Sequence, residues 1–102
     1  MSHSLSYQED RAFRVALGAE LAMRRQALGL TQRVLARRAQ MSQPSLSKYE
    51  LGEREISLTQ TLRLAAALRV PLFDLLGAVR GRLESQQEMS AAPAVEEGRR
   101  AA

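Results

Sequence analysis

Between residues 43 and 48, four side chains recur at i, i+1, i+4 and i+5, a spacing that places them on one face of a helix; they are Gln43, Pro44, Ser47 and Lys48. Glutamine offers a donor beside an acceptor, lysine offers a charged donor, and the proline ring is apolar. These groups match adenine N6 and N7, guanine O6 and N7, and the thymine methyl in a DNA major groove. The pattern favours a base-reading face, and the alternative is an ordinary solvent-facing side of a helix.

Two short helices separated by a tight break would position this face. The first is expected over Gln32 to about Ala39, with Thr31 as its N-cap. The second is expected to follow the Ser42 cap, with Pro44 at or next to its first position. It would run to about Leu51 and stop at Gly52, because glycine tolerates a left-handed C-cap.

The flanking segments predict three further helices. One starts near Asp10 and ends at Gly29, one follows a Ser57 cap, and a short last one starts at Pro71 and contains Leu72 to Leu76. Apolar residues at helical spacing give each of the two longer helices one buried face. The expected buried positions are Phe13, Leu17, Leu21, Leu28, Leu58, Leu62, Ala65 and Leu68.

These elements fit one compact all-α domain of five helices over residues 10–78. Residues 1–9 are polar and unpatterned, which predicts a flexible arm. Residues 79–89 could extend the last helix, but Gly77 and Gly81 each weaken a helix by roughly 1 kcal/mol relative to Ala. Residues 90–102 have little to bury and are expected to be a disordered tail.

The formal net charge is +4, and residues 10–80 hold twelve Arg or Lys against six Asp or Glu. This basic excess suits a domain that meets phosphate, although an arginine-rich solvated surface would look the same. No apolar run is long enough for a membrane span, and no secretory signal is recognisable, so a cytoplasmic location is expected. The one histidine is His3 and there is no cysteine, so we expect no enzyme, no metal site and no cofactor. No small-molecule effector is indicated.

The order of these residues resembles the helix-turn-helix of the lambda/434-repressor-like class, also called the Cro/C1 or XRE type. The resemblance covers roughly Leu17 to Leu76. It implies a transcriptional regulator, repressor-like, that binds double-stranded DNA in a sequence-specific manner. The matching residues are Gly29-Leu30-Thr31-Gln32, Leu35-Ala36, Ser42, Leu46, Glu50, Gly52, Ser57-Leu58, Leu62, Leu64-Ala65, Ala67-Leu68, Val70, Leu72 and Leu75-Leu76.

Within this resemblance, Gln43, Pro44, Ser47 and Lys48 are the expected base contacts. Phosphate contacts are expected from residues near helix N-termini and from two arginines, namely Gln32, Arg33, Ser42, Ser45 and Arg54. The glutamine at position 32 would also support the start of the recognition helix. Arg25 and Glu50 match positions where an ion pair joins the first and third helices. For the two arginines, simple solvent exposure is the competing interpretation.

Three residues depart from the family pattern. Gln40 stands where glycine usually makes a left-handed bend, which would cost a residue with a side chain roughly 1–2 kcal/mol. Leu51 replaces a common asparagine at the end of the recognition helix. Arg69 replaces another frequent glycine, after the fourth helix. None of the three removes the motif.

One recognition helix reads only a few base pairs, and the resembling family pairs two subunits on an inverted repeat. We therefore expect a homodimer through apolar residues of the last helix, Leu72, Phe73, Leu76, Val79 and Leu83. A phage-type repressor, a restriction-modification controller protein and an antitoxin that represses its own operon all remain open. The alternative class is a helical interaction module that docks a partner protein, such as an antitoxin that neutralises a toxin.

Overall fold

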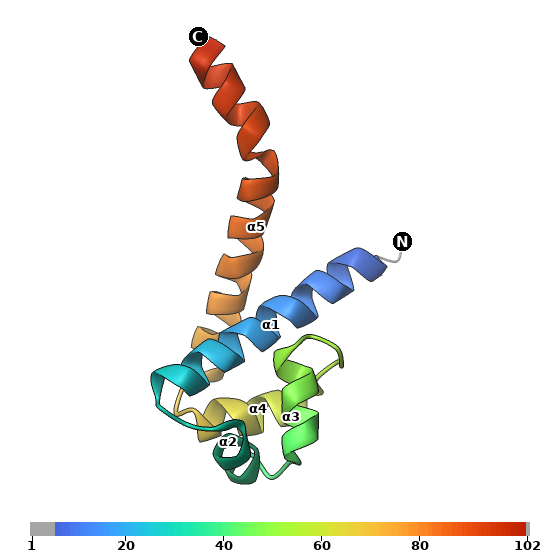
Figure 1. Cartoon of the computed structure of the whole chain (residues 1–102), viewed down its shortest axis with the longest axis vertical. Helices are drawn as coiled ribbons and strands as arrows, with labels where there is room; N and C mark the ends of the chain where they lie inside the picture. Colours follow the sequence, from blue (N-terminus) through green and yellow to red (C-terminus); the bar gives the residue numbers. More distant parts are fainter. Residues whose placement is uncertain (1–5, 102) are drawn as a thin grey trace.

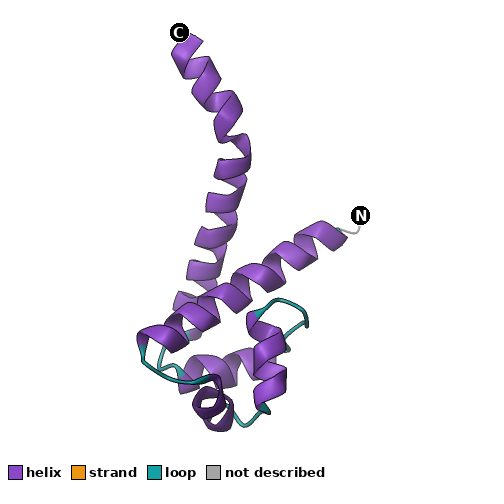
Figure 2. Ribbon diagram, in the orientation of Figure 1, coloured by secondary structure: helices purple, strands orange, loops and turns teal. Residues whose placement is uncertain are grey.

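Five α-helices make up the part of the chain that the structure, a computed structural model, describes; this part is the backbone of residues 6–101 and the side chains of residues 6–88. They are α1 (Tyr7–Ala27), α2 (Gln32–Arg38), α3 (Gln43–Glu50), α4 (Leu58–Ala67) and α5 (Leu72–Ala101). Figure 2 shows only helices and loops in this part of the chain, so the all-α prediction is confirmed. None of these helices is long and apolar enough to cross a membrane.

The first helix begins earlier than expected, at Tyr7 instead of near Asp10. Ser6 is its N-cap: the Ser6 hydroxyl accepts from the Glu9 backbone N–H at 3.1 Å, and the Glu9 carboxylate accepts from the Ser6 backbone N–H at 3.1 Å. This reciprocal capping box satisfies two N–H groups that a helix start leaves open. Residues 7–9, which were expected to belong to the flexible arm, are therefore helical. Residues 1–5 of that arm lie outside the described residues.

The three predicted caps of the central helices are present. In each, the side-chain oxygen accepts a hydrogen bond of 3.1 to 3.2 Å from the backbone N–H three residues later; the caps are Thr31, Ser42 and Ser57. Gln40 and Arg69 both adopt the left-handed conformation, with φ of 59° and 57°. The turns that the family usually makes with glycine are therefore made here by residues that carry side chains.

The core lies where α1, α2, α3, α4 and the first turns of α5 meet, and its largest fully buried side chains are Leu21, Leu35, Leu46, Leu64, Leu75 and Val79. The prediction for α4 was wrong on two positions, since Leu58 is 66% and Leu62 is 46% exposed. The buried face of α4 is instead Thr61, Leu64, Ala65 and Leu68. Leucines occur on both sides of this helix, and of the predicted positions Ala65 and Leu68 are buried, whereas Leu58 and Leu62 lie on the outer side. In α1, Leu17 and Leu21 are buried as predicted, whereas Phe13 is 38% exposed and Leu28, just after the helix, is 51% exposed.

The last helix is much longer than predicted: α5 has 30 residues, its first turns pack on the core, and the rest of it projects away from the other four helices (Figure 1). Residues 90–101, expected to be disordered, continue it. Their sequence is rich in Ala, Glu and Arg, strong helix formers, whereas the prediction weighed only their lack of apolar residues. Residue 102 lies outside the described residues.

The first turns of α5 dock on the core and use apolar residues that were assigned to a dimer interface. Val79 is 1% exposed within one chain, so its assignment to that interface was wrong. Leu75, Val79 and Leu83 form a stripe at i, i+4, i+8 that packs on the core. Leu72 and Leu76 are half-buried, and Phe73 is 84% exposed.

A buried carboxylate holds α5 against α1. Glu20, 3% exposed, accepts from Arg82 Nε through Oε1 and from Arg24 Nε through Oε2, both at 2.7 Å. Burial is the largest single influence and raises the pKa of Glu20, but the hydrogen bonds and charges of Arg82 and Arg24 together outweigh it. The pKa of Glu20 therefore lies below its ordinary value.

We expect Leu46→Ala to lower the free energy of unfolding by about 2–5 kcal/mol, because it removes a fully buried side chain and leaves a cavity. The matched substitution Leu62→Ala, on the outer face of α4, should cost within about 0.5 kcal/mol. Urea denaturation of both variants measures the contrast. Equal losses would contradict the assignment of Leu62 to the surface.

We expect Glu20→Gln to destabilise the fold by roughly 1–3 kcal/mol at neutral pH, because it weakens hydrogen bonds to charged partners. The folded-state pKa of Glu20 is depressed, so the ionised form adds stability that is fully present above the unfolded pKa of about 4.3. That stability is lost as the pH falls through the lower folded-state pKa.

The difference in unfolding free energy between wild type and Glu20→Gln should therefore shrink below that pH. Denaturation across an acid pH series measures it. Glu84→Gln is the matched control, since Glu84 pairs with Arg80 on the exposed surface of α5 at 3.4 Å and should change stability little. A difference that stays constant on acidification would show that the charge of Glu20 is not what holds α5.

Candidate nucleic-acid interface

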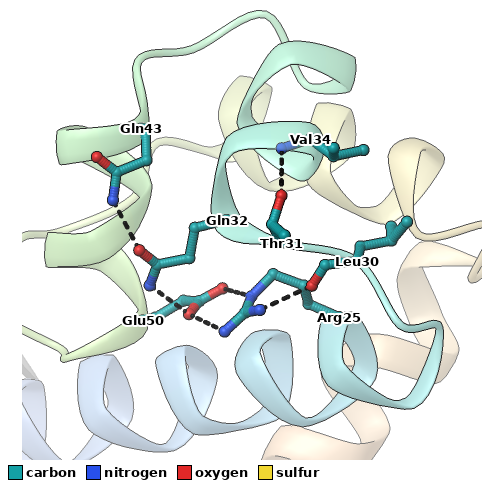
Figure 3. Close-up of polar contacts among 7 residues, drawn as sticks. All are labelled: Arg25, Leu30, Thr31, Gln32, Val34, Gln43 and Glu50. Atoms are coloured by element: carbon teal, nitrogen blue, oxygen red, sulfur yellow. Dashed lines mark hydrogen bonds and ion pairs between the residues drawn. The ribbon is translucent and has the colours of Figure 1, made fainter.

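One buried ion pair sets the position of α3 relative to α1. Arg25 Nε donates to Glu50 Oε2 at 2.7 Å, and Arg25 Nη2 donates to Glu50 Oε1 at 3.1 Å (Figure 3). Arg25 Nη1 donates to the Leu30 carbonyl oxygen at 2.8 Å, in the turn that leads to α2. The guanidinium thus joins α1, the α1–α2 turn and α3 through three hydrogen bonds. This is the pair that the resemblance implied.

Two glutamines extend this pair toward the surface. Gln32 Nε2 donates to Glu50 Oε1 at 2.9 Å, and Gln43 Nε2 donates to Gln32 Oε1 at 2.8 Å. Figure 3 shows the hydrogen bonds running from Arg25 to Gln43, the first residue of α3. Gln32, expected as a phosphate contact and a support, is half-buried and supports the start of α3 through these two bonds. Gln43 is exposed.

The predicted base-contacting residues form what we call the recognition face, namely Gln43, Pro44, Ser47 and Lys48. All four lie on α3; Gln43, Pro44 and Lys48 are exposed, and Ser47 is half-buried. The opposite side of α3 carries Leu46 and Tyr49, which are buried in the domain. The recognition face is therefore the side of α3 that remains available to a ligand.

Three of the predicted phosphate contacts gather at the start of α3. The Ser42 hydroxyl donates to Ser45 Oγ at 2.9 Å, and Arg54 Nη1 donates to the same oxygen at 3.4 Å. We call Ser42, Ser45 and Arg54 the α3 amino-terminal cluster. Arg33, the remaining candidate, lines an open cleft of ≈ 650 Å³ with Arg25, Thr31, Gln32 and Gln43.

Along α2 and α3 the charged side chains that reach the surface are all positive: Arg33, Arg37, Arg38 and Lys48. The only carboxylate on these two helices belongs to Glu50, whose side chain is 5% exposed and bound to Arg25. The surface built by the two helices therefore presents positive charge, as a phosphate backbone requires.

The sequence interpretation overlooked Gly18, which lies in the middle of α1. A Cβ atom at this position would stand 2.6 Å from the Glu50 carbonyl oxygen and would also overlap the Tyr49 carbonyl oxygen. Gly18 therefore allows the backbone of α3 to approach α1. A glycine inside an otherwise good helix was the available signal.

Tyr49, on the side of α3 that faces the domain, is buried. Its hydroxyl donates to Gln60 Oε1 on α4 at 2.7 Å, so that hydroxyl is directed into the domain and away from the recognition face. Gly52 ends the motif with φ of 73°, and its carbonyl oxygen accepts from Arg14 Nε at 3.3 Å.

Known proteins share this arrangement. A family model described as a helix-turn-helix domain matches residues 16–78. The structure of the clp gene regulator ClgR from Corynebacterium glutamicum superposes with a TM-score of 0.76 at 32% identity, covering 83% of this chain and 90% of that one. The restriction-modification controller protein C.AhdI from Aeromonas hydrophila gives a TM-score of 0.61 at 34% identity, covering 63% of this chain and 97% of that one.

A Rhodospirillum rubrum protein, described as an uncharacterized transcriptional regulator in the ATPase CF(0) region, is 41% identical over 56 residues. The match covers 55% of this chain, and the chain spans about half the length (52%) of that curated relative. The family match includes α2, α3 and every residue of the recognition face. The chain therefore belongs to the helix-turn-helix family, in its lambda-repressor-like, Cro/C1-type branch.

Proposed function

We propose that this protein binds double-stranded DNA in a sequence-specific manner through α3 and acts as a transcriptional regulator in the cytoplasm. The observation that carries the proposal is the recognition face, which stands exposed on a helix whose other side is locked into the core. A helix fixed in this way can present short polar side chains to base edges in a major groove. The two relatives described as regulators support the same role.

The surroundings of the recognition face suit a phosphate backbone. The α3 amino-terminal cluster presents two hydroxyls and a guanidinium beside the start of a helix, where the dipole favours an anion. Arg33 lies beside Gln32 at the neighbouring cleft. These groups would fix the position of α3 on the duplex, and Gln43, Pro44, Ser47 and Lys48 would read its sequence. The site consists of binding groups, and we assign it no catalytic role.

We also propose that two copies bind an inverted repeat, with half-sites about 34 Å apart, one turn of DNA. One α3 spans eight residues and reaches too few base pairs to single out a genomic site. Phe73 is the most exposed large apolar residue of the described chain and lies in the first turn of α5 with the half-buried Leu72 and Leu76. A second copy covering these three residues would remove that apolar surface from water.

We expect Gln43→Ala to weaken binding to a cognate duplex by about 1–3 kcal/mol and to relax the preference at one base pair. Arg54→Ala should instead weaken cognate and random duplexes alike and reduce the slope of log affinity against log salt by about one unit. Fluorescence anisotropy at two salt concentrations, on a cognate duplex found by selection from random DNA, measures both. Equal losses on cognate and random DNA for Gln43→Ala would refute the base-reading assignment.

We expect Phe73→Glu to abolish the dimer and leave a monomer that binds single half-sites weakly, since it places a charge in the apolar contact. Sedimentation with and without a palindromic duplex measures the stoichiometry. Leu62→Glu is the matched control, because it places the same charge on the exposed apolar face of α4. A 1:1 complex of the wild type on the palindrome would contradict the dimer, and loss of the dimer only in Leu62→Glu would move the interface to α4.

A further inference from the structure

We propose that Glu50 determines which base Gln43 prefers, acting through Gln32, although Glu50 does not reach the DNA. This inference rests on the proposed DNA-binding function. The side chain of Glu50 is 5% exposed, and both of its oxygens are engaged inside the domain. It is therefore a positioning residue, and its influence must pass through the side chains that it holds.

An ionised carboxylate can only accept hydrogen bonds. Paired with Arg25, Glu50 therefore accepts through Oε1 from the amide nitrogen of Gln32 at 2.9 Å. This fixes one of the two orientations that the Gln32 amide could take. The Gln32 oxygen must then point away from Glu50, toward α3, where Figure 3 shows it facing Gln43.

The same reasoning fixes the Gln43 amide. Because Gln32 Oε1 is an acceptor, Gln43 turns its nitrogen toward it and donates one hydrogen bond at 2.8 Å. The Gln43 oxygen points away from Gln32 in Figure 3. A primary amide nitrogen has two hydrogens, so Gln43 keeps one N–H donor and one oxygen acceptor for a ligand.

One donor beside one acceptor matches adenine, whose major-groove edge carries the N7 acceptor and the N6 donor. Guanine presents two acceptors, N7 and O6. The single remaining N–H of Gln43 could satisfy only one of them, and its oxygen would face the other. If the relay were broken, both N–H groups of Gln43 would be free and guanine would become acceptable. The charge on Glu50 thus favours adenine over guanine at one position.

The test compares two duplexes that carry A·T or G·C at the base pair whose preference depends on Gln43. The wild type should favour adenine by about ten- to a hundredfold. Gln32→Met breaks the relay but leaves the Arg25–Glu50 pair in place, so the ratio of the two affinities should fall. If Gln32 also binds a phosphate, its replacement would lower both affinities equally and leave that ratio unchanged. Gln86→Met, the same substitution on the exposed surface of α5, should keep the wild-type ratio.

Glu50→Gln should lower the ratio as well, because an amide at position 50 can donate and no longer dictates the orientation of Gln32. The double variant Glu50→Gln with Gln32→Glu should restore the preference for adenine, since a carboxylate at position 32 again only accepts from Gln43. A merely structural role of Glu50 would not give this rescue. Circular dichroism establishes that each variant is folded, and Gln32→Met decides the outcome if Glu50→Gln is not.

A folded Gln32→Met variant with the wild-type ratio would overturn the inference and leave the proposed function intact. A double variant that is folded and still lacks the preference would also count against it. If the wild type instead bound the selected duplex no more tightly than random DNA, the proposed function itself would fail. The two failures are thereby distinguished.

Discussion

The ion pair between Arg25 and Glu50 is the contact on which the arrangement of the helices depends. Its guanidinium donates hydrogen bonds to α3 and to the α1–α2 turn. Its carboxylate also accepts a hydrogen bond from the first residue of α2 (Figure 3). A buried pair of this kind adds little net stability compared with apolar packing, because both charges lose their hydration. Its value lies in geometry, since a bidentate contact accepts one relative placement of the helices. Gly18 completes this placement by removing the side chain that would hold α3 away from α1.

A second buried carboxylate applies the same principle to the other end of the domain. Glu20 joins Arg24 on its own helix to Arg82 on α5, so α5 is fixed by charge as well as by the stripe of Leu75, Val79 and Leu83. Glu20 accepts hydrogen bonds from two guanidinium groups, and Glu50 accepts from one guanidinium group and one amide. All buried polar side-chain atoms in the described residues have a partner, which is the condition under which buried charge can be tolerated.

Local chemistry made the central motif predictable. Thr31, Ser42 and Ser57 act as caps because a hydroxyl at a helix start has a nearby N–H to bind, a property that short sequences reveal.

Which face of a helix is buried was harder to predict. Leu58 and Leu62 have the spacing of a buried stripe, but Thr61 occupies the core side and satisfies its hydroxyl on the Ser57 carbonyl at 2.8 Å. Val79 was wrongly assigned to a dimer interface because the number of apolar residues that a core buries depends on the length of the helix that packs against it. The Ser6–Glu9 capping box was visible in the sequence and was overlooked.

Two of the residues proposed to bind DNA, Gln43 and Arg54, already make side-chain hydrogen bonds within the domain, and this has an energetic consequence. A free glutamine or arginine side chain loses rotamer freedom when it binds, at a cost of roughly 0.5–1.5 kcal/mol for each one immobilised. Gln43 is already held by Gln32, and Arg54 already contacts Ser45, so part of this ordering is complete before a ligand arrives. Lys48 has no such contact among the hydrogen bonds and ion pairs of the described side chains and would order on binding. The start of α3 is therefore the pre-organised part of the interface, and the lysine near its end supplies adaptable positive charge.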